Sequence, residues 1–94
     1  MRLNNKVCII TGAGGGMGKV AAEKFAEQGG KIAVFERDVD AGQNTVATIQ
    51  QNGGEAAFFK VDIANEQDVK NAVAATVEQF GKIDVLYNNA GVMP

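Results

Sequence analysis

The sequence of 94 residues predicts one α/β domain in which helices cover a parallel β-sheet. Two observations lead to this prediction. Apolar runs of four or five residues alternate along the chain with longer stretches in which apolar residues recur at helical spacing. The composition, with 46% hydrophobic and 21% charged residues, is typical of a globular domain. Strands that alternate with helices are joined by right-handed crossovers and therefore pair in parallel.

The short apolar runs are of the kind that strands buried on both faces produce. They comprise residues 7–10, 32–35, 56–59 and 83–87. Their expected order across the sheet is 3-2-1-4, as in the first part of a Rossmann-like doubly wound sheet. We therefore expect residues 1–94 to form one partial domain of this α/β class, truncated after its fourth strand.

The first expected helix follows a glycine-rich loop and ends at two glycines, residues 29–30. Glycine is common at the end of a helix because it adopts the left-handed conformation at little cost. Helical spacing places four side chains on the face expected to pack on the sheet. These are Met17, Val20, Ala21 and Phe25.

The second expected helix begins at a cap near Asp38 or Asp40 and ends at the glycine pair 53–54. Gly42 and Thr45 lower its intrinsic helix propensity, so it is the weakest of the three predicted helices. Its apolar positions are Val46 and Ile49.

The third expected helix has the clearest pattern. Asn65 is a suitable N-cap, Glu66 and Asp68 suit the first turn, and Gly81 is placed to end the helix in the left-handed conformation. Side chains at i, i+3, i+4, i+7, i+8 and i+11 line one face. They are Val69, Ala72, Val73, Thr76, Val77 and Phe80.

Charge and residue counts exclude several function classes. The net charge is −2 and basic residues occur singly, so neither nucleic acid nor a membrane is an expected partner. Cys8 is the sole cysteine and lies in an apolar run, where we expect a core thiol. With no histidine either, neither a disulfide nor a metal site is expected. No apolar run is long enough for a signal peptide or a membrane span, which favours a cytoplasmic protein.

Residues 11–18 form a glycine-rich loop between the first strand and the first helix. Five glycines in eight residues carry a large cost in backbone entropy, whereas a tight turn would need one or two. Without Cβ atoms, the backbone lets a pyrophosphate approach the N–H groups at a helix N-terminus. The glycines expected to serve this purpose are Gly12, Gly14, Gly15, Gly16 and Gly18.

The loop by itself leaves the phosphate ligand open. It does not fit a Walker loop, because Ala13 and Val20 stand where that pattern needs Gly and Ser or Thr. The pattern Gly-x-Gly-x-x-Gly fails from Gly12 or Gly14, and only its Ala variant fits, from Gly16. The glycine spacing is also similar to the loop of methyltransferases that bind S-adenosylmethionine.

Three motifs occur in order along the chain. Residues 11–18 read Thr-Gly-x-x-x-Gly-x-Gly, Asp62 follows the third expected strand, and residues 88–91 read Asn-Asn-Ala-Gly. With this order and spacing, almost the whole chain resembles the short-chain dehydrogenase/reductase family. The resemblance implies a nicotinamide dinucleotide cofactor. It also implies, for a longer parent chain, hydride transfer between the nicotinamide and an alcohol or carbonyl substrate. A methyltransferase would not account for residues 88–91.

The resemblance also implies roles for individual residues, all at the carboxyl ends of strands, where open α/β sheets bind ligands. Asn88 would tie neighbouring strands together. The implied cofactor contacts are Gly12, Gly16, Gly18 and the Met17 backbone for the pyrophosphate, Asp62 and Ile63 for the adenine, and Asn89, Ala90 and Gly91 for the ribose on the nicotinamide side.

The end of the second strand bears on the choice between NAD and NADP. Glu36 is placed to accept hydrogen bonds from the adenosine ribose, and its charge would repel a 2′-phosphate. Arg37 stands where NADP-using relatives often carry a basic residue. We expect NAD as the cofactor, with NADP less favoured.

No catalytic residue is expected in this chain. The family's Ser, Tyr-x-x-x-Lys and Asn lie beyond the fourth strand, and the residue four after Tyr87, the only tyrosine, is Gly91. Tyr87 is expected to pack within the fourth strand, and Asp84 to be a structural group at its start. The chain is therefore expected to be an inactive cofactor-binding part of an oxidoreductase. A stand-alone nucleotide-binding or interaction module remains the alternative.

The fourth strand is also expected to favour self-association. Residues 83–87 carry one charge and neither the proline nor the lysine that protects edge strands. The family's later helices would also cover one face of the first and fourth strands, so residues 7–10 and 83–87 are expected to be partly open on that side. We therefore expect self-association, either edge to edge through the fourth strand or by packing of the uncovered faces around a two-fold axis.

Overall fold

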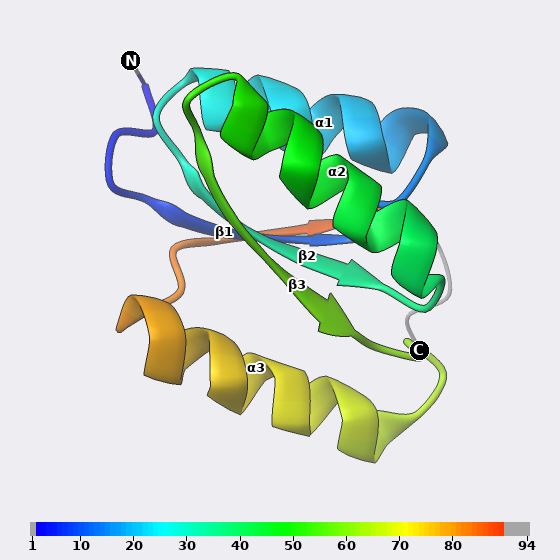
Figure 1. Cartoon of the computed structure of the whole chain (residues 1–94). Coiled ribbons are helices and arrows are strands. Elements are labelled where there is room, and N and C mark those ends of the chain that lie inside the picture. Colours follow the sequence, from blue (N-terminus) through cyan, green and yellow to red (C-terminus); the bar gives the residue numbers. More distant parts are fainter. Residues whose placement is uncertain (1, 90–94) are drawn as a thin grey trace.

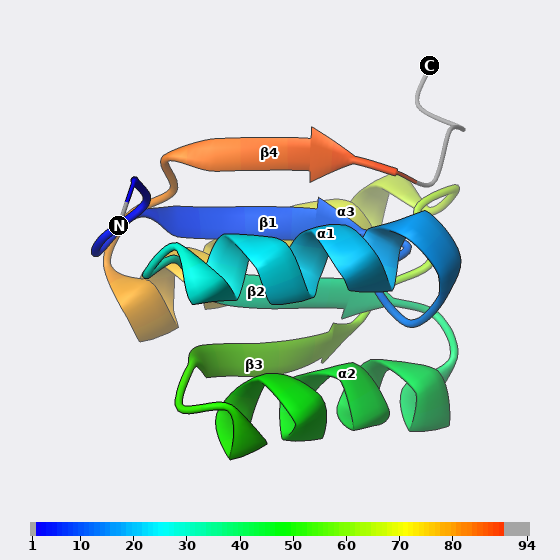
Figure 2. The same ribbon diagram turned by 90° about the horizontal axis from the view of Figure 1, so that it is seen from above.

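The structure, a computed structural model, describes residues 2–89. Four parallel strands form one sheet in the order β3-β2-β1-β4, which confirms the predicted fold and strand order. Helices α1 and α2 cover one face, and α3 covers the other (Figure 1). Figure 2 shows the four strands side by side, with β4 and β3 at the edges. The elements are β1 (Val7–Thr11), α1 (Gly16–Glu27), β2 (Lys31–Glu36), α2 (Val39–Gln51), β3 (Glu55–Lys60), α3 (Glu66–Phe80) and β4 (Val85–Asn88).

The two central strands supply most of the buried apolar residues. Every residue of β1 is buried, as are the four middle residues of β2, and Cys8 is a fully buried core thiol as expected. The side chains alternate between two core clusters because successive residues of a strand point to opposite faces. Ile10, Ile32 and Val34 pack towards α1 and α2, while Ile9 and Phe35 pack with residues of α3.

The predicted start of the fourth strand is wrong by two residues. The strand begins at Val85, because Asp84 and Val7 are joined by two hydrogen bonds that fix the chain just before it. The Val7 N–H donates to the Asp84 carboxylate at 2.9 Å, and the Asp84 N–H donates to the Val7 carbonyl at 2.9 Å. Ile83 instead packs against the core cluster under α3. Leu86 is 59% exposed, so β4 is not buried on both faces.

The predicted apolar face of the first helix is partly wrong. Met17 is 70% and Val20 is 47% exposed, whereas Gly18 and Ala22 are buried. Relative to the prediction, the helix is rotated so that Gly18 faces the loop. Its backbone packs so closely against Gly12 that a Cβ atom at Gly18 would collide with the Gly12 carbonyl oxygen. Close backbone packing at its first turn therefore decides which side chains face the sheet.

The helix ends follow the predicted capping. Asp38 and Asn65 are the N-caps of α2 and α3, and their side chains accept hydrogen bonds from the N–H groups of Ala41 and Asp68. Gly81 ends α3 with a φ of 88°. The predicted face of α3 is confirmed except at Val77, which is 42% exposed.

Candidate functional site

The candidate site lies where the strands of the sheet end, which we call the carboxyl edge, and where the glycine-rich loop leads from β1 into α1. The opposite end, where the strands begin, is the amino edge. Gly12 and Gly16 adopt φ values of 62° and 55°, which favour glycine. A Cβ atom at Gly15 or Gly16 would meet nothing within 4 Å. The backbone at these two residues is thus open to a ligand.

The N-terminus of α1 differs from those of α2 and α3. Its cap residue, Gly15, makes no side-chain hydrogen bond, and its first turn holds no acidic residue. The other two described helices have Asp38 and Asn65 as side-chain caps, with acidic residues in the first turn. The first N–H groups of a helix carry partial positive charge. The start of α1 is therefore the helix terminus that is best suited to an anion.

Two other glycines of the loop are needed for packing. A Cβ atom at Gly14 would lie 2.7 Å from Cγ and Oε1 of Glu36 and 2.8 Å from Cβ of Ala41. A Cβ atom at Gly18 would collide with the backbone of Gly12. These glycines bring β2, α2 and α1 close to the loop.

A cleft of about 260 Å³ adjoins the loop. The residues expected at the adenosine half of the cofactor all line this cleft, because β1, β2 and β3 end next to one another. They are Glu36, Arg37, Asp62 and Ile63. The cleft is lined by Thr11, Gly12, Phe35, Glu36, Arg37, Val61, Asp62, Ile63 and Ala64.

The Glu36 carboxylate has contacts that the sequence does not reveal. Oε1 accepts a hydrogen bond from the Gly14 N–H at 2.9 Å, and Oε2 accepts one from the Asp38 N–H at 3.0 Å. The side chain therefore joins the glycine-rich loop to the segment between β2 and α2. Asp62 is held in a similar way, because its carboxylate accepts from the Ala64 N–H at 3.0 Å.

Thr11 connects the ends of β1 and β4. Its hydroxyl donates to Oδ1 of Asn88 at 3.0 Å and accepts from the Asn89 N–H at 3.0 Å. The predicted role of Asn88 in tying neighbouring strands is confirmed. Asn89 lies beside the glycine-rich loop, with its Nδ2 3.5 Å from the Gly12 carbonyl oxygen. Ala90 and Gly91 lie outside the described residues.

The ionisable groups with shifted pKa values, Cys8 and Asp84, lie at the amino edge of the sheet, near the starts of β1 and β4. The hydrogen bond from Val7, followed by contact with Lys82, lowers the pKa of Asp84. Its side chain is 24% exposed and its oxygen lies 3.1 Å from the Lys82 Nζ. Burial, and then the charge of Asp84, raises the pKa of the Cys8 thiol. Asp84 thus has structural contacts, as predicted. Tyr87 packs edge-on against Phe25, with ring centroids 5.7 Å apart.

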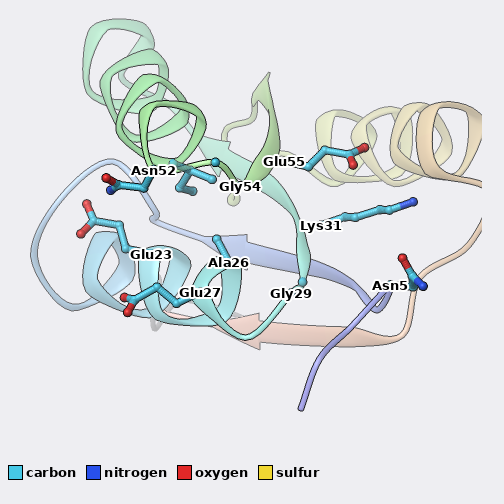
Figure 3. A pocket seen from close by; sticks show the side chains of 12 residues that line it. Asn5, Glu23, Ala26, Glu27, Gly29, Lys31, Asn52, Gly54 and Glu55 are labelled. Carbon is cyan, nitrogen blue, oxygen red and sulfur yellow. The ribbon is translucent and has the colours of Figure 1, made fainter. Parts of the chain in front are cut away.

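A second cavity, of about 350 Å³, lies at the amino edge of the sheet (Figure 3). Figure 3 shows Glu23 and Glu27 on one side and Glu55 with Lys31, its register partner in the sheet, on the other. The carboxylates are spread around the cavity. Residues 2–89 contain no group of three or more His, Cys, Asp or Glu side chains that could hold a metal ion. Within the same residues, none of the helices has the length and apolar character to cross a membrane.

Known proteins share this arrangement. The model of the short chain dehydrogenase family matches residues 6–94. An uncharacterized oxidoreductase of Thermotoga maritima is 48% identical over 94 residues, which are 100% of this chain and 37% of the relative. A hydroxysteroid dehydrogenase from Escherichia coli superposes with a TM-score of 0.93 at 39% identity, over 98% of this chain and 42% of that chain. A xylitol dehydrogenase with bound NAD⁺ gives a TM-score of 0.93 at 39% identity, over 98% of this chain and 35% of that chain.

The chain thus spans little more than a third of the length of the Thermotoga maritima relative. The matches nevertheless include the glycine-rich loop, the cleft beside β2 and β3, and the end of β4. Sequence, fold and the geometry of the carboxyl edge agree, and the chain belongs to the short-chain dehydrogenase family.

Proposed function

We propose that this chain binds NAD at the carboxyl edge of its sheet and is the cofactor-binding part of an oxidoreductase. The observation that carries the proposal is the start of α1, which has no side-chain cap and no acidic residue in its first turn. The open backbone of Gly15 and Gly16 adjoins it. A pyrophosphate placed there would accept hydrogen bonds from backbone N–H groups, including that of Met17, and would meet the positive end of the helix dipole.

The two nucleoside halves of the cofactor would then lie on either side of the loop. The adenosine half would occupy the cleft in which Asp62 and Ile63 lie beside Glu36. The ribose on the nicotinamide side would lie near Asn89, which contacts Thr11 and Gly12. This placement follows the rule that open α/β sheets bind ligands beyond the carboxyl ends of their strands.

Glu36 favours NAD over NADP. It lines the cleft, and a 2′-phosphate on the adenosine ribose would bring a second negative charge close to its carboxylate. Arg37 is exposed and lines the same cleft, so it offers a partial counter-charge. We expect the repulsion to dominate because both Glu36 oxygens are fixed by backbone hydrogen bonds and cannot turn away freely.

Calorimetric titration with NAD and NADP tests this assignment. We expect NAD to bind at least about tenfold more tightly, which corresponds to about 1.4 kcal/mol. Replacing Glu36 with Ala should narrow the difference by weakening NAD binding and improving NADP binding. Tighter binding of NADP to the unmodified chain would overturn the preference, and binding of neither nucleotide would overturn the proposed function.

The whole protein would interconvert an alcohol and a carbonyl compound. The alcohol loses a hydride from its carbon to the nicotinamide and a proton from its hydroxyl to a base, which leaves the carbonyl product, reduced cofactor and the protonated base. The 94 residues contain no Tyr-x-x-x-Lys motif and no histidine to serve as this base.

The purified 94-residue chain should therefore bind the cofactor without turning over. Incubation with NAD and a panel of alcohols should give no NADH above the level of a protein-free control, measured by absorbance. The alternative, a nucleotide-binding or interaction module without catalysis, predicts the same absence of NADH, so NADH formation would contradict both. NADH formation that depends on the chain would show that it carries its own general base.

We also propose that the 94-residue chain self-associates through β4. Every residue of β1 is buried, so the expectation that residues 7–10 are partly open is wrong. On the outer strand β4, Leu86 is 59% exposed and is available to contact a second copy. Light scattering over a concentration series should show a mass that rises with concentration, and Leu86→Lys should reduce this rise. A constant monomer mass at high micromolar concentration would contradict the proposal.

A further inference from the structure

A single peptide group of the glycine-rich loop is held from both sides. The Ala13 carbonyl oxygen accepts a hydrogen bond from the Thr45 hydroxyl at 2.8 Å. The N–H of the same peptide group, which belongs to Gly14, donates to Oε1 of Glu36 at 2.9 Å. In a trans peptide, the C=O and N–H groups point in opposite directions. The peptide plane is therefore fixed between α2 on one side and the end of β2 on the other.

The Thr45 hydroxyl is directed at the loop from the interior of the molecule. Thr45 is fully buried, and so is Ala13. The hydroxyl also lies 3.2 Å from the Ala41 carbonyl oxygen within α2, which is longer than its 2.8 Å bond to Ala13. Without this donor, the buried Ala13 carbonyl would lose a hydrogen-bond partner, and such groups are rarely left unpaired in folded proteins.

Gly42 brings Thr45 within reach of the loop. A Cβ atom at Gly42 would overlap the ring of Phe58 on β3, so glycine at this position lets α2 lie close against the sheet. Gly14 has the same effect on the other side, because a Cβ atom there would collide with Ala41 of α2. The two residues that weaken the predicted helix, Gly42 and Thr45, therefore both serve its contact with the loop.

We propose that Thr45 and Glu36 act together as a clamp on the Ala13–Gly14 peptide and thereby position the glycine-rich loop for the cofactor. Thr45 is a positioning residue, since it lines no part of the cleft. The clamp fixes the chain directly before Gly15 and Gly16, whose open backbone leads into the first turn of α1. The inference rests on the proposed function, because it concerns the same dinucleotide.

The clamp also links the choice between NAD and NADP to how firmly the glycine-rich loop is held. Glu36 is the residue proposed to favour NAD, and the same carboxylate holds the Gly14 N–H. A substitution at Glu36 that is meant to admit a 2′-phosphate therefore also releases one side of the loop. We expect such a variant to gain less affinity for NADP than the removal of charge alone would give.

Three variants of the 94-residue chain test the clamp. Thr45→Val keeps the shape of the side chain and removes the donor, while Thr45→Ser keeps the hydroxyl. Thr76→Val is the matched control, because Thr76 is also fully buried and its hydroxyl bonds the carbonyl four residues earlier at 2.8 Å, in α3, away from the loop. We expect Thr45→Val to weaken NADH binding about tenfold, Thr45→Ser to restore it to within about threefold, and Thr76→Val to change it less than about twofold.

Amide hydrogen exchange of Gly14, measured by NMR without ligand, separates the clamp from the proposed function. Exchange should become about tenfold faster in Thr45→Val and in Glu36→Ala, but not in Thr76→Val. The Glu36 variant tests the same peptide if Thr45→Val fails to fold. Gly14 exchange equal to that of the unmodified chain in both variants would overturn the clamp. Faster exchange with no NADH binding by the unmodified chain would leave the clamp standing and refute the proposed function.

Discussion

At the carboxyl edge of the sheet, Gly14 and Gly18 touch neighbouring side chains or backbone, while Gly15 and Gly16 face open space. At the amino edge, Gly29 and Gly53 follow helices α1 and α2 with φ values of 90° and 85°. Both edges are glycine-rich, but for different reasons. Glycine at the amino edge ends helices in the left-handed conformation. At the carboxyl edge, glycine permits close packing at some positions and leaves backbone amides accessible at others. A glycine therefore indicates a binding site when it neither packs closely nor adopts a left-handed φ, as at Gly15, whose φ is −166°.

The largest effect is expected for Gly18→Ala. The new Cβ atom would collide with the Gly12 carbonyl, a backbone atom that cannot move without shifting β1 or α1. We expect the free energy of unfolding to fall by about 3 kcal/mol, as for an overpacked core. Urea denaturation followed by circular dichroism measures the change. A loss below about 1 kcal/mol would show that the start of α1 can move away from β1.

We expect Gly15→Ala to weaken NAD binding without disturbing the packing of the loop. Its φ of −166° is extended and suits any residue, and the new methyl group would meet nothing within 4 Å. Stability should fall by about 0.5 kcal/mol, because Gly is preferred over Ala at an N-cap. The methyl group would occupy the space proposed for the pyrophosphate, so NAD affinity measured by calorimetry should fall about tenfold. Unchanged affinity would place the phosphates elsewhere.

The opposite outcome is expected at the amino edge for Gly53→Ala. The left-handed conformation there should cost an alanine about 1 kcal/mol of stability, although the new methyl group has space around it. NAD affinity should stay within about twofold of the unmodified chain, since residue 53 lies at the end of the sheet remote from the loop. Together with Gly15→Ala, this variant tests whether the two edges are functionally separate.

The smallest effect is expected for Asp84→Asn, and it should depend on pH. The pKa of Asp84 is lowered in the folded chain, first by the hydrogen bond from Val7 and then by Lys82. Its ionised form therefore adds stability above the ordinary pKa of 3.8, and this contribution is lost as the pH falls below that value through the folded pKa. The difference in unfolding midpoint between the two proteins should be constant near pH 7 and shrink below about pH 4. If the difference in unfolding midpoint grew as the pH fell, the pKa of Asp84 would be raised in the folded chain and not lowered.

Much of the fold could be predicted from short-range patterns in the sequence. Residues 7–10 and 32–35 form buried strands, as their apolar runs predict. The capping residues Asp38, Asn65 and Gly81 depend on local hydrogen bonding and backbone preference, and they lie where the pattern placed them. The orientation of α1 could not be predicted in this way. Its burial is decided by contact between Gly18 and Gly12, and hydrophobic periodicity gives no weight to a glycine that packs by lacking a side chain.

The same distinction between local patterns and tertiary contacts applies to the candidate site. The sequence by itself determined the glycine-rich loop, the acidic end of β2 and the Asn-Asn segment after β4, because each is a local pattern at the end of a strand. Only the tertiary structure decided that Glu36 holds Gly14, that Thr45 holds Ala13, and that Thr11 joins Asn88 and Asn89. These partners lie 22 to 78 positions apart along the chain. Hydrogen bonds between residues so far apart leave no periodic trace in the sequence. They form only when the fold brings the loop, α2 and the strand ends together.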